Sequence, residues 1–326
     1  MKKKNILSTR EKIINIAIKF HKKGNITEAI KYYQFCINSN FNEPAIFSNF
    51  ASILQNHGKL NEAEIYLLKA IEINPDFVDA HLNLGNTYKE LGRLKEAEKH
   101  TRKVIMLRPE SPTAYLNLGN IQSDIGHKEE AILSYKKAIK FKPFFADAYC
   151  NLSIIYRGIN KLKDAEKNVR KAIEINPKFS TAYCNLSNIL KDLGNLEEAE
   201  KNARKAIEIN PNYATAYYNL GTILISSKNY KEAEICFRKA LNINPEFSRA
   251  HNNLGMVLME LFRVVEAEKY FRKAIHLNQS NIDAHNNLIN LLILNGDQVE
   301  ALKHSKIILK LRPWSINASY QFNWGV

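Results

Sequence analysis

Apolar and small side chains recur along this chain with a period of 34 residues. When the chain is numbered in 34-residue repeats from Arg10, position 7 is apolar in every repeat: Ile16, Phe50, Leu84, Leu118, Leu152, Leu186, Leu220, Leu254 and Leu288. Position 8 is small in eight of the nine repeats, with Ile289 as the exception, and position 20 is alanine in all nine. Small residues at fixed places predict a close contact between two helices in each repeat.

Each repeat is predicted to contain two helices. Positions 20, 24 and 27 have the spacing of one helix face, and the proline at position 32 ends the second helix because proline cannot continue it. These prolines are Pro75, Pro109, Pro143, Pro177, Pro211, Pro245 and Pro313. The predicted organisation is a basic N-terminal extension at 1–9, repeats at 10–43, 44–77, 78–111, 112–145, 146–179, 180–213, 214–247, 248–281 and 282–315, and a tail or aborted tenth repeat at 316–326.

This period and its residues resemble those of the tetratricopeptide repeat (TPR) family. The third repeat shows the pattern clearly, with Leu84, Gly85, Tyr88, Ala97 and Pro109. Departures are His81, His251 and His285 at the aromatic position 4, which we interpret as core histidines, and Phe41 and Gln279 at the proline position. The resemblance implies an all-α fold: an α-solenoid, a right-handed TPR superhelix of about nine helix-turn-helix repeats, whose first helices line a long concave surface that binds other polypeptides.

Asparagine occupies position 6 of every repeat: Asn15, Asn49, Asn83, Asn117, Asn151, Asn185, Asn219, Asn253 and Asn287. Positions 2, 6, 9 and 13 of the first helix share one face, because spacings of three and four residues return to the same side. Two interpretations stay open: each amide bonds a neighbouring helix, or the series forms a ladder that binds a client. A side-chain amide has both a donor and an acceptor, which match the backbone of an extended peptide. We therefore hypothesise a peptide-binding ladder.

Other polar residues on this face extend the candidate site. Position 9 contributes Asn86, Asn120 and Asn188, and positions 2 and 13 contribute Asp79, Asp124, Asp147 and Asp192. Each amide hydrogen bond contributes only about 0.5–1.5 kcal/mol, so we expect selectivity to come from these neighbours. Their acidic character predicts a basic or Ser/Thr-rich client segment.

A TPR array with asparagine at position 6 is similar to the superhelical region of the O-linked N-acetylglucosamine transferases. The segments 148–152 and 182–186, both Ala-Tyr-Cys-Asn-Leu, show this likeness, which covers about residues 44–315. It implies that the asparagine series holds client peptides. Only 11 residues follow the last repeat, so we expect no transferase activity from this chain. Besides an adaptor or scaffold, two alternatives stay open: a non-catalytic targeting subunit for an enzyme supplied in trans, and a truncated relative of such an enzyme.

Charge raises the question of nucleic acid. The chain has 47 Lys and Arg against 33 Asp and Glu, a net charge of +14, and the second helices carry basic pairs at positions 25–26. Such a cationic stripe attracts nucleic acid. In five repeats, however, a glutamate four residues before the arginine is placed to pair with it: Glu98–Arg102, Glu166–Arg170, Glu200–Arg204, Glu234–Arg238 and Glu268–Arg272. These pairs disfavour nucleic-acid binding.

The sequence has no Gly-rich phosphate loop, nucleophile elbow or metal-ligand cluster. We therefore expect a protein that is not an enzyme and has no cofactor or metal. Cys36, Cys150, Cys184 and Cys236 lack the paired spacing of a zinc site and are expected to be free thiols. Neither a signal peptide nor an apolar run of about 18 residues is found, which predicts a cytoplasmic protein without a membrane span.

Overall fold

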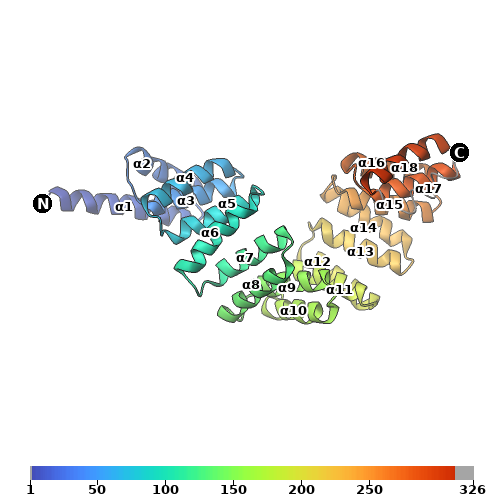
Figure 1. The fold of residues 1–326 in the computed structure, drawn as a ribbon, viewed down its shortest axis with the longest axis horizontal. Coiled ribbons are helices and arrows are strands. Elements are labelled where there is room, and N and C mark those ends of the chain that lie inside the picture. Colours follow the sequence, from blue (N-terminus) through green and yellow to red (C-terminus); the bar gives the residue numbers. More distant parts are fainter. Residues whose placement is uncertain (1, 313–326) are drawn as a thin grey trace. The chain divides into compact units, whose positions relative to one another are not determined.

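The computed structural model describes residues 2–312, and within this range every regular element is an α-helix (Figure 1). In chain order they are α1 (Lys2–Lys22), α2 (Ile26–Asn38), α3 (Pro44–Asn56), α4 (Leu60–Ile73), α5 (Val78–Glu90), α6 (Leu94–Leu107), α7 (Pro112–Ile125), α8 (Lys128–Phe141), α9 (Ala146–Gly158), α10 (Leu162–Ile175), α11 (Ser180–Asp192), α12 (Leu196–Ile209), α13 (Ala214–Ser226), α14 (Tyr230–Ile243), α15 (Ser248–Glu260), α16 (Val264–Leu277), α17 (Ile282–Leu294) and α18 (Gln298–Leu311). The two helices predicted for each repeat are confirmed. The segment proposed as an N-terminal extension is helical from Lys2, and the proposed tail at 316–326 lies outside the described residues.

The chain forms two compact units, residues 1–155 and 156–326, and α9 spans the division. In the N-terminal unit the pairs α1–α2, α3–α4, α5–α6 and α7–α8 each pack on the next pair, and α5 also contacts α3 and α7. In the C-terminal unit the pairs α11–α12, α13–α14, α15–α16 and α17–α18 do the same, with contacts from α11 through α13 and α15 to α17. Since each pair contacts its neighbours, the buried core of each unit runs along the array, as in a solenoid.

Positions 8 and 24 fit together inside the helix pairs. A Cβ atom added to Gly119 would lie 2.6 Å from the ring of Tyr135, and one added to Gly255 would lie 2.6 Å from the ring of Phe271. The small residue therefore makes room for an aromatic ring of the second helix against the backbone of the first. Glycine is needed here because any side chain would overlap the ring.

Repeat 9 reverses the sizes at these two positions. Ile289 takes the small position of α17 and is fully buried, and its counterpart on α18 is Ser305, which is also buried. In repeat 8 the same places hold Gly255 and Phe271. The departure at Ile289 is thus accompanied by a small partner on the second helix, which keeps the combined volume suited to a closely packed interior.

Asparagine ends several second helices before the expected proline. Asn74, Asn176, Asn210 and Asn244 are extended, as the residue before a proline prefers. Asn278 has the same extended backbone although Gln279 follows it, and its Oδ1 accepts a 3.0 Å hydrogen bond from the Ser280 N–H. The missing proline of repeat 8 therefore does not prolong α16.

The turn between the two helices of a repeat needs a left-handed residue at position 15. Glycine supplies it in six repeats, at φ values from 73° to 98°. Asn160, Lys228 and Phe262 adopt the same conformation at φ of 59°, 59° and 60°. For a bulky L-residue this conformation is unfavourable, so Phe262 is the most unusual of the three. No helix within residues 2–312 is long and apolar enough to cross a lipid bilayer.

Candidate functional site

The position-6 asparagines of the N-terminal unit join successive first helices. The Nδ2 of Asn83 on α5 donates to the Ser48 hydroxyl of α3 at 3.2 Å. The Nδ2 of Asn117 on α7 donates to the Asn86 Oδ1 at 2.7 Å, and the Nδ2 of Asn151 on α9 donates to the Asn120 Oδ1 at 2.8 Å. Every one of these bonds runs back to the preceding repeat.

The C-terminal unit repeats the arrangement with other acceptors. The Nδ2 of Asn219 lies 3.0 Å from the Cys184 Sγ, and the Nδ2 of Asn253 donates to the Tyr218 hydroxyl at 3.3 Å. The Nδ2 of Asn287 donates to the Asn252 Oδ1 at 2.9 Å. The donor always comes from position 6, whereas the acceptor is position 5 here and position 5 or 9 in the N-terminal unit. These contacts give the asparagine series a structural role between repeats.

The amide oxygens of the same residues differ from their nitrogens in their contacts. No described protein donor lies within hydrogen-bond distance of the Oδ1 atoms of Asn83, Asn117, Asn151, Asn219 and Asn287. Among the described side chains, the one buried nitrogen or oxygen without a partner is Nδ1 of His251. None of the five oxygens is therefore a fully buried atom. Asn219 as a whole is buried, whereas Asn83, Asn117, Asn151 and Asn287 are half-buried, so the accessible acceptors are the Oδ1 atoms of these four. Asn49 and Asn185 are half-buried at the same position, and Asn15 is exposed.

Family comparisons follow the same register. The tetratricopeptide repeat is matched at residues 45–77, 66–99, 112–145, 146–179, 179–246 and 248–281. These matches together take in more than half of the chain. This chain belongs to the tetratricopeptide repeat family. TPR proteins generally act as scaffolds for protein–protein interactions, and the extended surfaces of stacked repeats suit that role.

Several solved structures share the TPR fold of this chain. The crystal structure of the APC/C hetero-tetramer Cut9–Hcn1 has a TM-score of 0.67 at 17% identity, over 92% of this chain and 58% of that chain. A tetratricopeptide repeat protein from Parabacteroides merdae has a TM-score of 0.63 at 18% identity, over 77% of this chain and 99% of that chain. Pseudomonas aeruginosa pilF has a TM-score of 0.57 at 22% identity, over 67% of this chain and 97% of that chain. This chain thus spans little more than half of the Cut9–Hcn1 chain it matches. No curated protein matches it.

The position-9 residues differ in their use within the TPR array. Asn86 accepts from Asn117, and Asn120 accepts both from Asn151 and from the Tyr135 hydroxyl at 2.9 Å. Asn188 is half-buried and makes no hydrogen bond with the described protein atoms. Asn86 and Asn120 therefore hold the side chains of Asn117 and Asn151 in place, whereas Asn188 forms no such contact among the described residues.

Three of the four predicted acidic residues are ion-paired. Asp192 contacts Arg157 at 2.6 Å, Asp124 contacts Lys89 at 3.5 Å, and Asp79 contacts Arg108 at 3.9 Å. Asp147 is exposed and has no ion pair among the described residues. The first-helix face is therefore less acidic than the sequence predicts, because basic residues that the sequence pattern did not place beside it neutralise part of the charge.

The second helices carry an ion-pair series that sequence reasoning missed in part. All five predicted pairs within a helix are present, from Arg102–Glu98 at 2.6 Å to Arg272–Glu268 at 2.8 Å. In addition, four arginines reach the position-19 glutamate of the next repeat: Arg170–Glu198, Arg204–Glu232, Arg238–Glu266 and Arg272–Glu300. The acidic residue at position 19 of all nine repeats is the feature of the sequence that could have predicted these pairs between repeats. These arginines are engaged by carboxylates, which weighs against a nucleic-acid interface.

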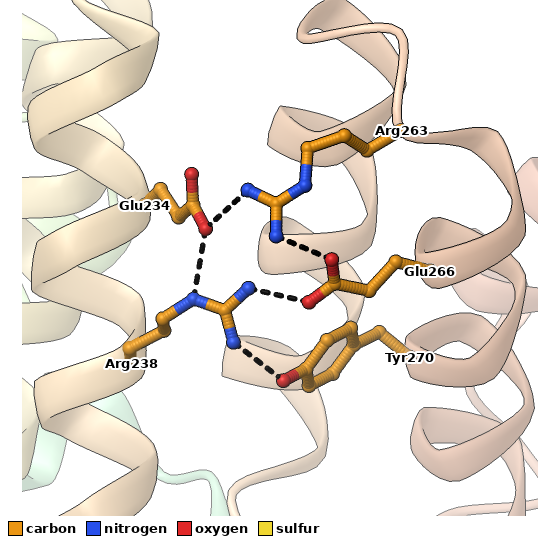
Figure 2. A network of polar contacts seen from close by, with 5 residues as sticks. All are labelled: Glu234, Arg238, Arg263, Glu266 and Tyr270. Atoms are coloured by element: carbon orange, nitrogen blue, oxygen red, sulfur yellow. Dashed lines mark hydrogen bonds and ion pairs between the residues drawn. The ribbon is translucent and has the colours of Figure 1, made fainter.

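Figure 2 shows this series between α14 and α16. Arg238 donates to Glu234 at 2.8 Å, to Glu266 at 2.5 Å and to the Tyr270 hydroxyl at 2.9 Å. Arg263 bonds the same two carboxylates, with 2.7 Å to Glu234. The hydrogen bond to Arg238, more than that to Arg263, lowers the pKa of Glu266. Two arginines and two glutamates form one neutral network.

Two repeats contain a pair of core histidines. The Nε2–H of His81 donates to the Pro75 carbonyl at 2.9 Å, which leaves its Nδ1 to accept from the Nδ1–H of His100, also at 2.9 Å. His285 and His304 form the same Nδ1–Nδ1 contact at 2.8 Å. Burial, and next the electrostatic interaction with His81, lower the pKa of His100 to about 4. These histidines are bonded core residues, and no group of three metal-ligating side chains is found among the described residues.

Proposed function

We propose that this protein is a scaffold that binds extended polypeptide segments along the first helices of its repeats. The observation that carries the proposal is the set of accessible Oδ1 atoms at position 6, at Asn83, Asn117 and Asn151 in the N-terminal unit and at Asn287 in the C-terminal unit. Each oxygen can accept a hydrogen bond from the backbone N–H of a client. Such a row binds main chain without regard to sequence.

The hydrogen bonds to the preceding repeat support this role. Because the Nδ2 of Asn117 is held by Asn86 at 2.7 Å, the Oδ1 of Asn117 is fixed in orientation before a client arrives. A fixed acceptor loses little side-chain entropy on binding. With helices about 10 Å apart and a peptide rise of about 3.3 Å per residue, one asparagine would meet every third client residue.

Selectivity is assigned to the residues around the row. At about 0.5–1.5 kcal/mol per hydrogen bond, the amide oxygens alone bind weakly, because ordering each client residue costs about 1–2 kcal/mol. Asp147 has no ion pair, and Asn188 no hydrogen bond, with the residues that the structure describes, so both are polar neighbours that a client can engage. We propose a client segment with basic or hydroxyl side chains opposite them.

The experiment compares two sets of substitutions that remove the same four hydrogen bonds between repeats from opposite sides. The ladder variant is Asn83→Ala, Asn117→Ala, Asn151→Ala and Asn287→Ala. The control variant is Ser48→Ala, Asn86→Ala, Asn120→Ala and Asn252→Ala, which removes the acceptors and keeps the position-6 asparagines. Clients are captured from native lysate with each protein and identified by mass spectrometry, after thermal melting has matched the stability of the two variants.

The control keeps every position-6 Oδ1 acceptor but no longer fixes its orientation, so clients lost from the ladder variant and retained more weakly by the control support binding by the asparagine row. Clients lost equally from both variants would assign the loss to the broken contacts between repeats and would contradict a binding role of the Oδ1 acceptors. Clients retained by both would exclude the row as a binding site.

A second proposal, a targeting subunit for an enzyme supplied in trans, rests on the asparagine at position 6 of all nine repeats, the feature that resembles the O-linked N-acetylglucosamine transferases. It requires an enzyme that co-purifies with the native protein at constant stoichiometry through successive columns. Loss of every enzyme at the first column would leave the scaffold as the simpler function.

A further inference from the structure

Phe262 is a strained residue with no packing role. It lies in the turn between α15 and α16 with φ of 60°, and 91% of its surface is exposed. Six repeats place glycine at this position. An L-residue with a bulky side chain is disfavoured in the left-handed region, and a side chain so exposed gains almost nothing from burial. Strain that the fold does not need is a feature of functional sites.

A second exposed apolar side chain lies three residues further along the chain. Val265, in the first turn of α16, is 75% exposed. It borders a shallow depression that runs along one face of α16 and is lined by Val265, Glu266, Lys269, Tyr270 and Lys273. Residues 265, 269 and 273 are four apart and therefore follow one another along this face. Position 18, where Val265 lies, is polar in repeats 1–7.

The charge of this depression is positive. The carboxylate of Glu266 is held by Arg238 and Arg263, as Figure 2 shows. Lys269 and Lys273 are exposed, and neither forms an ion pair with any of the residues that the structure describes. The equivalent lysines of repeats 5 and 6 are ion-paired. Lys171 pairs with Glu174 at 2.6 Å, and Lys205 pairs with Glu208 at 2.7 Å. In repeat 8 the place of that glutamate is taken by His276.

We propose that Phe262, Val265, Lys269 and Lys273, here called the α16 surface, bind an acidic segment of a partner protein in which apolar side chains are followed by carboxylates. The apolar side chains cover Phe262 and Val265, and the carboxylates pair with the two lysines. The occupant follows from charge complementarity, because the two lysines have no counter-ion in the described part of the chain and the carboxylate of Glu266 is already paired with Arg238 and Arg263. The α16 surface includes a second helix, so this proposal does not depend on the asparagine row of the first helices.

The test uses the whole chain and two fluorescein-labelled peptides. The first has four leucines followed by four glutamates, and the second has four lysines in place of the glutamates. Binding is measured by fluorescence anisotropy for the wild type, for Phe262→Gly and for Lys269→Glu/Lys273→Glu. Lys228→Gly is the matched control, because Lys228 occupies the same left-handed position in repeat 7. Both glycine variants should melt at a higher temperature than the wild type, since each relieves a left-handed L-residue.

The expected result separates binding from folding. Phe262→Gly should weaken the affinity for the glutamate peptide at least about tenfold, as expected for the loss of an aromatic side chain that the bound peptide buries. This loss should appear although the variant is more stable than the wild type. Charge reversal at Lys269 and Lys273 should abolish binding, and Lys228→Gly should bind as the wild type does. The lysine peptide should not bind.

The proposal is overturned if the wild type fails to bind the glutamate peptide at millimolar concentration, if Phe262→Gly binds it unchanged, or if the lysine peptide binds equally well. Sedimentation of the wild type and of Phe262→Gly is the remaining check. Self-association of the wild type that Phe262→Gly removes would identify a second copy of this chain as the occupant and would also overturn the proposal.

Discussion

At the scale of the residue, the match between positions 8 and 24 decides what each repeat tolerates. Gly255→Ala places a Cβ atom 2.6 Å from the ring of Phe271, which is fully buried and cannot move away freely. We expect a loss of about 1–3 kcal/mol in the free energy of unfolding, measured by urea denaturation. Gly255→Ala/Phe271→Leu should recover part of this loss, because the smaller side chain leaves room for the methyl group. Equal losses in both variants would contradict the proposed overlap.

The histidine pair of repeat 3 predicts a dependence of stability on pH. In the unfolded chain His100 titrates near pH 6.5, and burial and His81 lower its pKa to about 4 in the folded protein. Between these values the unfolded chain binds more protons, so stability should be complete above about pH 6.5 and should fall as the pH falls toward 4. The groups facing His100 are His81, Lys99, Glu96 and the Tyr88 ring.

Thermal melting between pH 4 and 7 tests this expectation. His100→Tyr should flatten the acid side of the profile, and tyrosine at this position already stacks on a histidine in repeat 8, at Tyr270 and His251. His127→Gln changes an exposed histidine and should leave the profile as it is. A profile equally steep in His100→Tyr would assign the acid sensitivity to other groups.

Single residues were the hardest level to predict. The position-6 asparagines were found because they recur strictly, but their acceptors were not, since Ser48, Cys184 and Tyr218 share no residue type. Likewise the ion pairs of Asp124 and Asp192 depend on Lys89 and Arg157, whose position 12 holds different residues in other repeats. A contact between repeats leaves a clear mark in the sequence only when both partners recur.

At the scale of the element, ion pairs tie the second helices together. Arg238 bonds Glu234 within α14 and Glu266 and Tyr270 on α16. We expect Arg238→Ala to lower the free energy of unfolding by about 1–2 kcal/mol, because partly exposed ion pairs contribute little each and the network adds a few hydrogen bonds.

Urea denaturation at low and high salt checks this prediction. The loss should shrink in 1 M NaCl because salt screens partly exposed charges. Lys231→Ala, on an exposed turn of α14, should cost much less. If the two variants lost the same free energy of unfolding at both salt concentrations, the network would contribute no more to stability than an ordinary exposed residue.

The helices were predictable because the residues that end each helix lie close to that end in the sequence. The spacing of apolar positions and the recurring proline gave two helices for each repeat, and Asn278 shows that the asparagine before this position ends the helix even when Gln279 replaces proline. The ion pairs between second helices were only half predicted, because a spacing of four residues is visible within one helix whereas Arg238 and Glu266 are 28 residues apart.

At the scale of the whole molecule, contacts between neighbouring repeats predict how damage spreads. Gly255→Ala weakens α15 and α16, which contact α14 and α17. Because each repeat is stabilised by its neighbours, amide hydrogen exchange should become faster in α13–α18 and stay at the wild-type rate in α3–α6. Exchange measured by mass spectrometry checks this, with Ser187→Ala at the same position of repeat 6 as the control. Faster exchange throughout the chain would indicate a single cooperative transition.

The asparagine bonds have a consequence for how such an array changes over evolutionary time. Each donor lies in one repeat and its acceptor in the repeat before it, and acceptors as different as a serine, an asparagine, a cysteine and a tyrosine serve. A gene duplication or deletion of one whole 34-residue repeat would bring a donor next to a new acceptor without requiring a second mutation. The contact between repeats accepts several residue types, and the number of repeats can therefore change while the fold is kept.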